Sequence, residues 1–203
     1  TWLITLNRCI LASKSQLKHG FKTEAEGIAS RLRAELNIHP CAPLDAYKLA
    51  KHLNVAVYKS FEFIQSIESI NELSGNNGQD CGWSALTMIT KAGNQIIIHN
   101  EYNTPQRQQS DLMHELAHII CGHKREKREY TFQLPFGMHE YNEIHEEEAK
   151  WLGATLQLSK PCLYWGKKYK NDFQLIADYY NCSLEMVTYR MNVTKIGLYK
   201  NTN

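Results

Sequence analysis

Hydrophobic residues recur every three or four positions in several stretches of the chain, which is the spacing of an amphipathic helix. Residues 21–36 are the first such stretch, with apolar side chains at Phe21, Ala25, Ile28, Leu32 and Leu36. A linker with two prolines follows at residues 37–43. Further helices are predicted at residues 44–53, 143–158, 172–180 and 184–192.

Shorter hydrophobic runs predict β-structure. Val55 to Tyr58 predicts one strand, and residues 83–89 and 95–98 flank a Lys-Ala-Gly-Asn turn and predict a hairpin. Residues 71–82 are rich in Asn and Gly and predict a loop. We therefore expect an α+β fold in which a small antiparallel sheet packs against helices.

One more helix is predicted from Pro105 to near Cys121. Pro105 suits the first turn of a helix, and Gly122 suits the position just after its end. The apolar face of this helix consists of Leu112, Leu116, Ile119 and Ile120. The helix carries the pentapeptide His114-Glu115-Leu116-Ala117-His118, which has the form H-E-x-x-H.

This motif is typical of a catalytic zinc site. His114 and His118 lie four residues apart, so both imidazoles project from one helical face and can bind one ion. A catalytic zinc keeps one position open for water, whose pKa it lowers toward about 7. Glu115 projects from nearly the same side and can accept the proton as the water attacks a carbonyl group. We expect one Zn²⁺ ion, with Glu115 as the general base.

The third ligand decides the class of zinc site. The metzincin extension of the motif requires Gly at position 121 and His at position 124, where this chain has Cys121 and Lys124. That class is excluded. The alternative is a carboxylate from a later helix, and residues 145–156 supply one. The small residues of this segment suit a helix that lies close against the motif helix.

Three segments together resemble the ImmA/IrrE family of metallo-endopeptidases. They are the strand Ile96-Ile97-Ile98-His99-Asn100, the H-E-x-x-H helix, and the run Glu146-x-x-Ala149-x-x-Leu152-Gly153-Ala154-x-Leu156. The resemblance covers roughly residues 40–192. The family pattern E-x-x-A-[ND]-x-F-A-x-x-L-L-x-P implies that the ligand is Glu146, not Glu147 or Glu148. Departures from it are Lys150, Leu152, Gln157 and Ser159.

The resemblance implies a function as well as a fold. It implies a zinc-dependent endopeptidase with His114, His118 and Glu146 as metal ligands. The expected partner is a helix–turn–helix repressor, whose cleavage derepresses stress or mobile-element genes. The alternative is a non-catalytic regulatory or DNA-binding module that contains the metal. Glu115 favours the enzyme, because a purely structural metal site has no use for a general base.

Composition sets the wider organisation. The 203 residues are 43% hydrophobic, which suffices for one cored domain with small additions. We expect an N-terminal helical segment at 1–39, a zinc peptidase core at 40–160, and a C-terminal helical segment at 161–203 that packs on the core. The net charge of +2 indicates no strong attraction to nucleic acid or membrane. Six scattered cysteines without a C-x-x-C motif favour reduced thiols and a cytoplasmic location.

The C-terminal segment supports a rival interpretation. Residues 175–191 resemble a helix–turn–helix, with Ser183 as the N-cap of the second helix. Residues 160–203 contain seven Lys or Arg against three Asp or Glu. However, Arg190 is the only long cation of the second helix, which is poor for reading bases. We therefore expect packing helices and no nucleic-acid partner.

Other residues near the motif are weighed against ordinary structural roles. Cys121 is interpreted as a core thiol, His123 as a surface or loop residue, and Asn100 as the end of a strand. Trp83 is assigned to core packing rather than to a substrate groove. Candidates for stabilising an oxyanion lie between the two metal-bearing helices; they are His139, Tyr141 and His145.

Overall fold

The computed structural model describes residues 17–63, 83–90, 92–123 and 142–196. The predicted loop at 71–82 lies outside these ranges. The helices are α2 (Phe21–Glu35), α3 (Ala46–His52), α5 (Pro105–Ile120), α6 (Glu143–Gln157), α7 (Lys160–Tyr169), α8 (Phe173–Tyr180) and α9 (Leu184–Thr194). The strands are β1 (Ala56–Lys59), β2 (Ala85–Ile89) and β3 (Gln95–His99), and a short 3₁₀ helix, η1, covers Ser60–Glu62.

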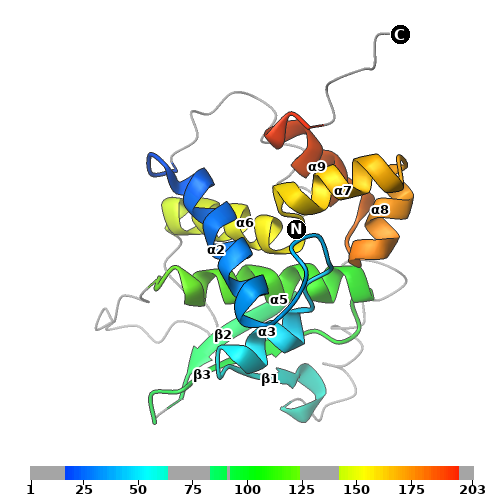
Figure 1. Ribbon diagram of the computed structural model, residues 1–203. Helices are drawn as coiled ribbons and strands as arrows, with labels where there is room; N and C mark the ends of the chain where they lie inside the picture. The colour runs from blue at the N-terminus through cyan, green and yellow to red at the C-terminus, as the bar shows by residue number, and fades with distance from the viewer. Residues whose placement is uncertain (1–16, 64–82, 91, 124–141, 197–203) are drawn as a thin grey trace, which may run out of the picture.

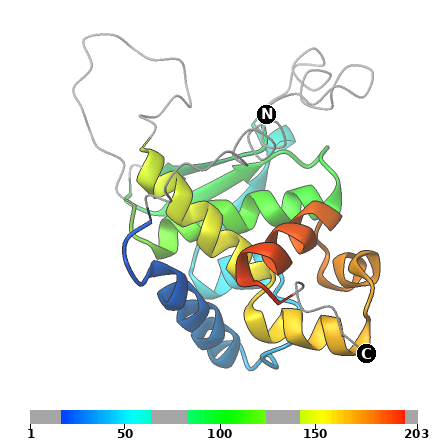
Figure 2. The same cartoon turned by 90° about the horizontal axis from the view of Figure 1, so that it is seen from above.

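The motif helix α5 lies at the centre of this arrangement. It packs on one side against β2 and β3 of the sheet and on the other against α6, and α2 covers α6 (Figure 1). Seen from above, α6 runs across α5, and α7, α8 and α9 gather at one end of the pair (Figure 2). The α+β prediction is confirmed, and the central helix carries the motif.

The sheet differs from the expectation in one strand. The predicted hairpin is present, with β2 antiparallel to β3 and Thr87 opposite Ile97. The strand order is β1-β3-β2, and β1 runs parallel to β3, so the sheet is mixed rather than antiparallel. Parallel neighbours need a long connection, and the chain between β1 and β3 exceeds the dozen residues this takes. Only the short turn between β2 and β3 dictates antiparallel pairing.

The ends of α5 follow from local chemistry. The Thr104 hydroxyl accepts the Arg107 backbone N–H as an N-cap, and Pro105 occupies the first turn, where its missing N–H costs nothing. The helix ends at Ile120, as predicted, and Gly122 adopts a left-handed φ of 66° just beyond it. Among the described residues, no helix is both long and apolar enough to cross a membrane.

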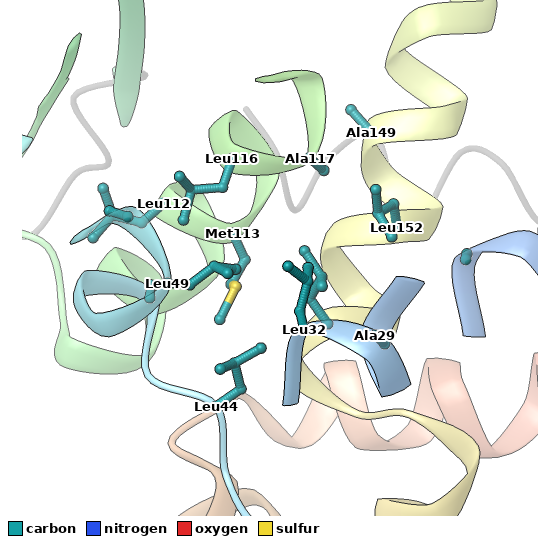
Figure 3. Close-up of a cluster of buried hydrophobic side chains, with 14 of the residues drawn as sticks. Ala29, Leu32, Leu44, Leu49, Leu112, Met113, Leu116, Ala117, Ala149 and Leu152 are labelled. Atoms are coloured by element: carbon teal, nitrogen blue, oxygen red, sulfur yellow. The ribbon is translucent and has the colours of Figure 1, made fainter. Parts of the chain in front are cut away.

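Buried apolar side chains from α2, α3, α5 and α6 form the larger of two cores (Figure 3). Leu112, Met113, Leu116 and Ala117 of α5 are each fully buried in it. These inward-facing residues occupy one face of α5, and His114 and His118, one turn apart, occupy another. This packing fixes the rotation of α5 about its axis, and with it the direction of the histidines.

The contact between α5 and α6 is unusually close at one residue. A Cβ atom added at Gly153 of α6 would lie 3.1 Å from the Met113 carbonyl oxygen and 3.2 Å from the His114 Cα. These atoms belong to the α5 backbone and cannot rotate away. A residue without a side chain is therefore required where α6 passes the first ligand of the motif.

A second core joins α7, α8 and α9 around Leu163, Ile176 and Val187. The helix α7 was not predicted, and its local signal is Pro161, which occupies the first turn. The predicted pair α8 and α9 is present, and the Ser183 hydroxyl accepts the Met186 N–H as its N-cap.

Arg190 attaches α9 to the rest of the chain. Its side chain is fully buried, donates to the Leu158 carbonyl at 2.9 Å and pairs with Glu26 of α2 at 2.7 Å. Glu26 also accepts the Lys160 backbone N–H at 2.9 Å. Arg190, the one long cation on the second helix of the predicted helix–turn–helix, therefore serves internal packing.

Candidate metal centre

The two motif histidines turn the same ring nitrogen toward one point. His114 and His118 lie one turn apart on α5, and their Nε2 atoms are 3.1 Å from each other. Their side chains are 10% and 20% exposed, so the rings are held by the protein while one side of the pair faces solvent. Two adjacent imidazole nitrogens at this distance suit a shared cation.

Glu146 completes the group from the first turn of α6. Its carboxylate oxygens lie 3.3 Å from His114 Nε2 and 3.4 Å from His118 Nε2. The Asn142 side chain starts α6 just before it by accepting the N–H groups of Ile144 and His145. Since Glu146, Ala149 and Gly153 share one face of α6, the close passage at Gly153 directs Glu146 toward the histidines.

The three ligand atoms fit the spacing of a zinc site. His114, His118 and Glu146 are the one group of three or more potential ligands that the described part of the chain brings within 4.8 Å of one another. Ligands bound to zinc at about 2.0–2.2 Å in a tetrahedral arrangement lie about 3.3–3.5 Å apart. The observed separations of 3.1, 3.3 and 3.4 Å are close to this value. The residues present therefore fit the metal.

The electrostatics of Glu146 also favour a cation. Burial opposes ionisation of its carboxyl group, but the adjacent imidazole groups of His114 and His118 outweigh burial and lower the pKa of Glu146 well below its usual value. The group is therefore a carboxylate at neutral pH. An anionic oxygen beside two imidazole nitrogens is the two-His-one-carboxylate ligand set.

Glu115 is held from the sheet side. The Thr87 hydroxyl of β2 donates a hydrogen bond to Glu115 Oε2. Thr87 is 5% exposed and is a polar residue within a largely apolar strand. This contact holds the Glu115 carboxylate against β2, on the helix that also carries both histidines. The role of Thr87 follows only from the packing of β2 on α5.

The chain matches the peptidase M78 family, described as an IrrE N-terminal-like domain, over residues 75–192. This stretch contains the motif helix and Glu146 and spans more than half of the chain. The chain belongs to this family. The resemblance inferred from the motifs is thereby confirmed, and the coarse activity of the family is that of a metallopeptidase.

The chain also resembles a solved structure. A Mycobacterium tuberculosis transcriptional regulator superposes with a TM-score of 0.49 at 10% sequence identity. The match covers 87% of this chain and 48% of the regulator, so the chain spans about half of that protein's length. None of the curated proteins compared with the chain matches it.

In this M78 chain, His123 lies in the loop after α5, as one of the two expected alternatives has it, but it is not a surface residue. Its side chain is 8% exposed, its Nδ1 lies 2.9 Å from His118 Nδ1, and its Nε2 lies 3.0 Å from Glu148 Oε2. Burial lowers the pKa of His123, which favours the neutral ring. The sequence signal that could have indicated this position is Gly122, the helix stop that precedes it.

The other residues weighed near the motif differ in burial and in their contacts. Cys121 is a free thiol packed against the main core, and burial raises its pKa to about 12, which agrees with a core role. Asn100 is buried and donates to the Trp83 carbonyl, joining the ends of β3 and β2. His145 stacks on the His123 ring at 4.3 Å. The remaining oxyanion candidates, His139 and Tyr141, lie outside the described residues.

A buried carboxyl group lies one turn before the first ligand. Asp111 accepts hydrogen bonds from Arg107 Nε at 3.2 Å and from Asn103 at 3.4 Å. Burial raises the pKa of Asp111 to about 6, and Arg107 limits the rise. This group ties the start of α5 to the preceding loop and does not join the ligand cluster.

Proposed function

We propose that this chain is a zinc-dependent endopeptidase that cleaves a helix–turn–helix repressor. The observation that carries the proposal is the convergence, at zinc spacing, of Glu146 from α6 with His114 and His118 of α5, the helix that also holds Glu115. Membership of the M78 family supports peptide-bond hydrolysis. The substrate class rests on the resemblance to ImmA/IrrE proteins, and derepression of stress or mobile-element genes would be its consequence.

Each residue has a defined task in this proposal. Zinc, when bound by the two histidines and Glu146, supplies a Lewis acid that activates water and polarises the substrate carbonyl group. Glu115 acts as general base and accepts the proton of the attacking water. Because the Thr87 hydroxyl donates to Oε2 of Glu115 and lowers its basicity, Oε1 is the preferred oxygen for the proton. The same carboxyl group can then deliver the proton to the leaving amine.

The rival functions are weaker on specific grounds. A non-catalytic metal module would need neither the motif carboxylate of Glu115 nor the Thr87 hydroxyl that bonds to it. A DNA-binding module would need cations on α9, and Arg190 is instead buried against Glu26. The enzyme therefore explains more of the polar residues in and around α5.

The decisive experiment separates catalysis from metal binding. The zinc-loaded wild type and its Glu115→Gln variant are incubated with a proteome-derived peptide library, and new termini are identified by mass spectrometry. The amide oxygen of the variant would keep the Thr87 hydrogen bond, but the amide could not take a proton. Cleavage should therefore fall by at least about 10²–10⁴-fold while zinc content stays at one equivalent. Helix–turn–helix repressors encoded beside the chain form a second substrate arm.

The outcomes distinguish the parts of the proposal. Metal-dependent cleavage lost in Glu115→Gln supports the peptidase, and cleavage of a neighbouring repressor supports the substrate class. If the zinc-loaded wild type produced no new termini in either arm, the enzyme assignment would be wrong. Tight repressor binding without cleavage would favour the regulatory module.

A further inference from the structure

The two nitrogens of His118 have different neighbours. Nε2 faces His114 and Glu146, and Nδ1 lies 2.9 Å from Nδ1 of His123. The other nitrogen of His123, Nε2, lies 3.0 Å from Glu148 Oε2. A continuous hydrogen-bonded chain therefore runs from a carboxylate of α6, through His123, to a ligand of the candidate metal centre.

We infer that Glu148 and His123 are positioning residues that keep the proton of His118 on Nδ1 and so present its Nε2 lone pair to the metal. The inference rests on the proposed metal site at His114, His118 and Glu146. It assigns a role to two residues outside the group of three ligands.

The direction of the chain follows from what each group can donate. The Glu148 carboxylate can only accept, so His123 Nε2 must carry the proton of that ring. In a neutral imidazole the other nitrogen then accepts, so His123 Nδ1 receives the hydrogen bond from His118 Nδ1–H. His118 Nε2 is left with its lone pair directed at His114 and Glu146. Every step has one donor and one acceptor, and the final tautomer is the one that binds a metal through Nε2.

The backbone at the end of α5 explains why His123 lies there. The His123 N–H bonds to the His118 carbonyl at 3.1 Å, and the Gly122 N–H bonds to the Ile119 carbonyl at 3.0 Å. With Gly122 at a φ of 66°, this pair of bonds is a Schellman motif. In that motif the residue after the glycine returns to the residue five positions earlier. The helix stop thus brings His123 back beside His118.

The His123 ring, which this turn places beside His118, is fixed by stacking against His145 of α6. The rings of His123 and His145 lie 4.3 Å apart and are inclined by 8°. His145 and Glu148 are three residues apart on α6, so they approach His123 from the same helical face. One face of α6 thus holds His123, and the adjacent face places Glu146 at the metal centre.

The experiment compares zinc affinity and the proton positions of His123 and His118. Zinc Kd is measured by competition with a chromophoric chelator for the wild type, His123→Ala, His123→Asn and Glu148→Ala. Loss of such outer contacts costs about 10–100-fold in metal affinity, so we expect that weakening in His123→Ala. The Asn oxygen can replace the accepting Nδ1, so His123→Asn should recover much of the loss. Glu147→Ala removes a neighbouring charge of the same sign and should leave the Kd within about twofold.

A spectroscopic readout separates positioning from a general effect on the fold. In the zinc-loaded protein, ¹⁵N-histidine NMR should show His123 protonated on Nε2 only, and the His118 Nδ1 proton protected from exchange. Both signatures should be lost in Glu148→Ala even if its melting temperature is unchanged. A wild-type His123 protonated on Nδ1, or unchanged zinc affinity in both His123→Ala and Glu148→Ala, would overturn the inference. Failure of the wild type to bind zinc would instead refute the proposed function.

Discussion

Two glycines at helix contacts show how differently the two halves of this molecule are built. A Cβ atom at Gly153 of α6 would meet the backbone of α5 beside His114. A Cβ atom at Gly166 of α7 would meet only the side chain of Ile176, at 3.1 Å. The first contact is limited by backbone, which cannot yield, whereas the second is limited by a side chain, which can rotate. The contact limited by backbone atoms lies beside the metal ligands His114, His118 and Glu146, which must lie at fixed distances from one another.

The polar groups of the two regions differ in the same way. In the C-terminal region, strong donors meet complementary acceptors: Arg190 bonds through Nη2 to Glu26 and through Nε to the Leu158 carbonyl, and Tyr180 donates to the Cys41 carbonyl at 2.6 Å. At the end of α5, two imidazole nitrogens and a carboxylate turn toward one another. Groups of this kind offer lone pairs to the same point. Paired donors and acceptors indicate that the polar groups stabilise the fold, whereas lone pairs that converge on one point indicate a site for a cation.

The largest effect is expected when the metal ligand on α6 is changed. Glu146→Gln removes the negative charge that faces both histidines, so we expect zinc affinity to fall by more than about 100-fold. Glu147→Gln, one position further along the helix and about 100° around it, should change affinity less than about twofold. Competition titration with a chelator measures both. Equal losses in the two variants would show that bulk charge, not ligation, binds the metal.

The matching change in the C-terminal region should affect stability alone. Arg190→Ala leaves Glu26 without its partner in a partly buried position, so we expect the free energy of unfolding to fall by about 3 kcal/mol. Zinc affinity per folded molecule should stay within about twofold, because Arg190 bonds outside the ligand cluster. Urea unfolding of the metal-free protein gives the first quantity. A large loss of zinc affinity would mean that the two regions are coupled.

The smallest effects come from the two glycines themselves. Gly153→Ala forces α6 away from α5 and should cost about 1–2 kcal/mol of stability, with a drop of about tenfold in zinc affinity as Glu146 moves. Gly166→Ala should be nearly neutral, because the gain of about 1 kcal/mol in helix propensity offsets a shift of Ile176. Paired urea unfolding and zinc titration test this. Similar costs at both positions would contradict the distinction between backbone and side-chain limits.

Local sequence signals were sufficient for the motif helix but not for its surroundings. Pro105, the three- and four-residue spacing of apolar side chains and Gly122 define α5 without knowledge of the fold. The metal-ligand glutamate required a family pattern, because Glu146, Glu147 and Glu148 are chemically identical and only the packing at Gly153 distinguishes them. Thr87 could not be assigned, since its partner Glu115 comes from another element.

Two further features of the fold have local sequence signals. A glycine just after a helix places the next residue against the last full turn, so Gly122 already indicated that His123 returns to His118. Pro161 likewise suits the start of α7. The parallel pairing of β1 with β3 is different in kind. It depends on a long connection whose path no local pattern specifies.

The central claim is that His114, His118 and Glu146 bind one metal ion. The most direct measurement is a zinc titration of the metal-free wild type by chelator competition, run beside His118→Ala. We predict saturation at one equivalent in the wild type, and loss of tight binding when His118 Nε2 is removed. Wild-type protein that binds well under one equivalent, or a His118→Ala variant with unchanged affinity, would contradict the account.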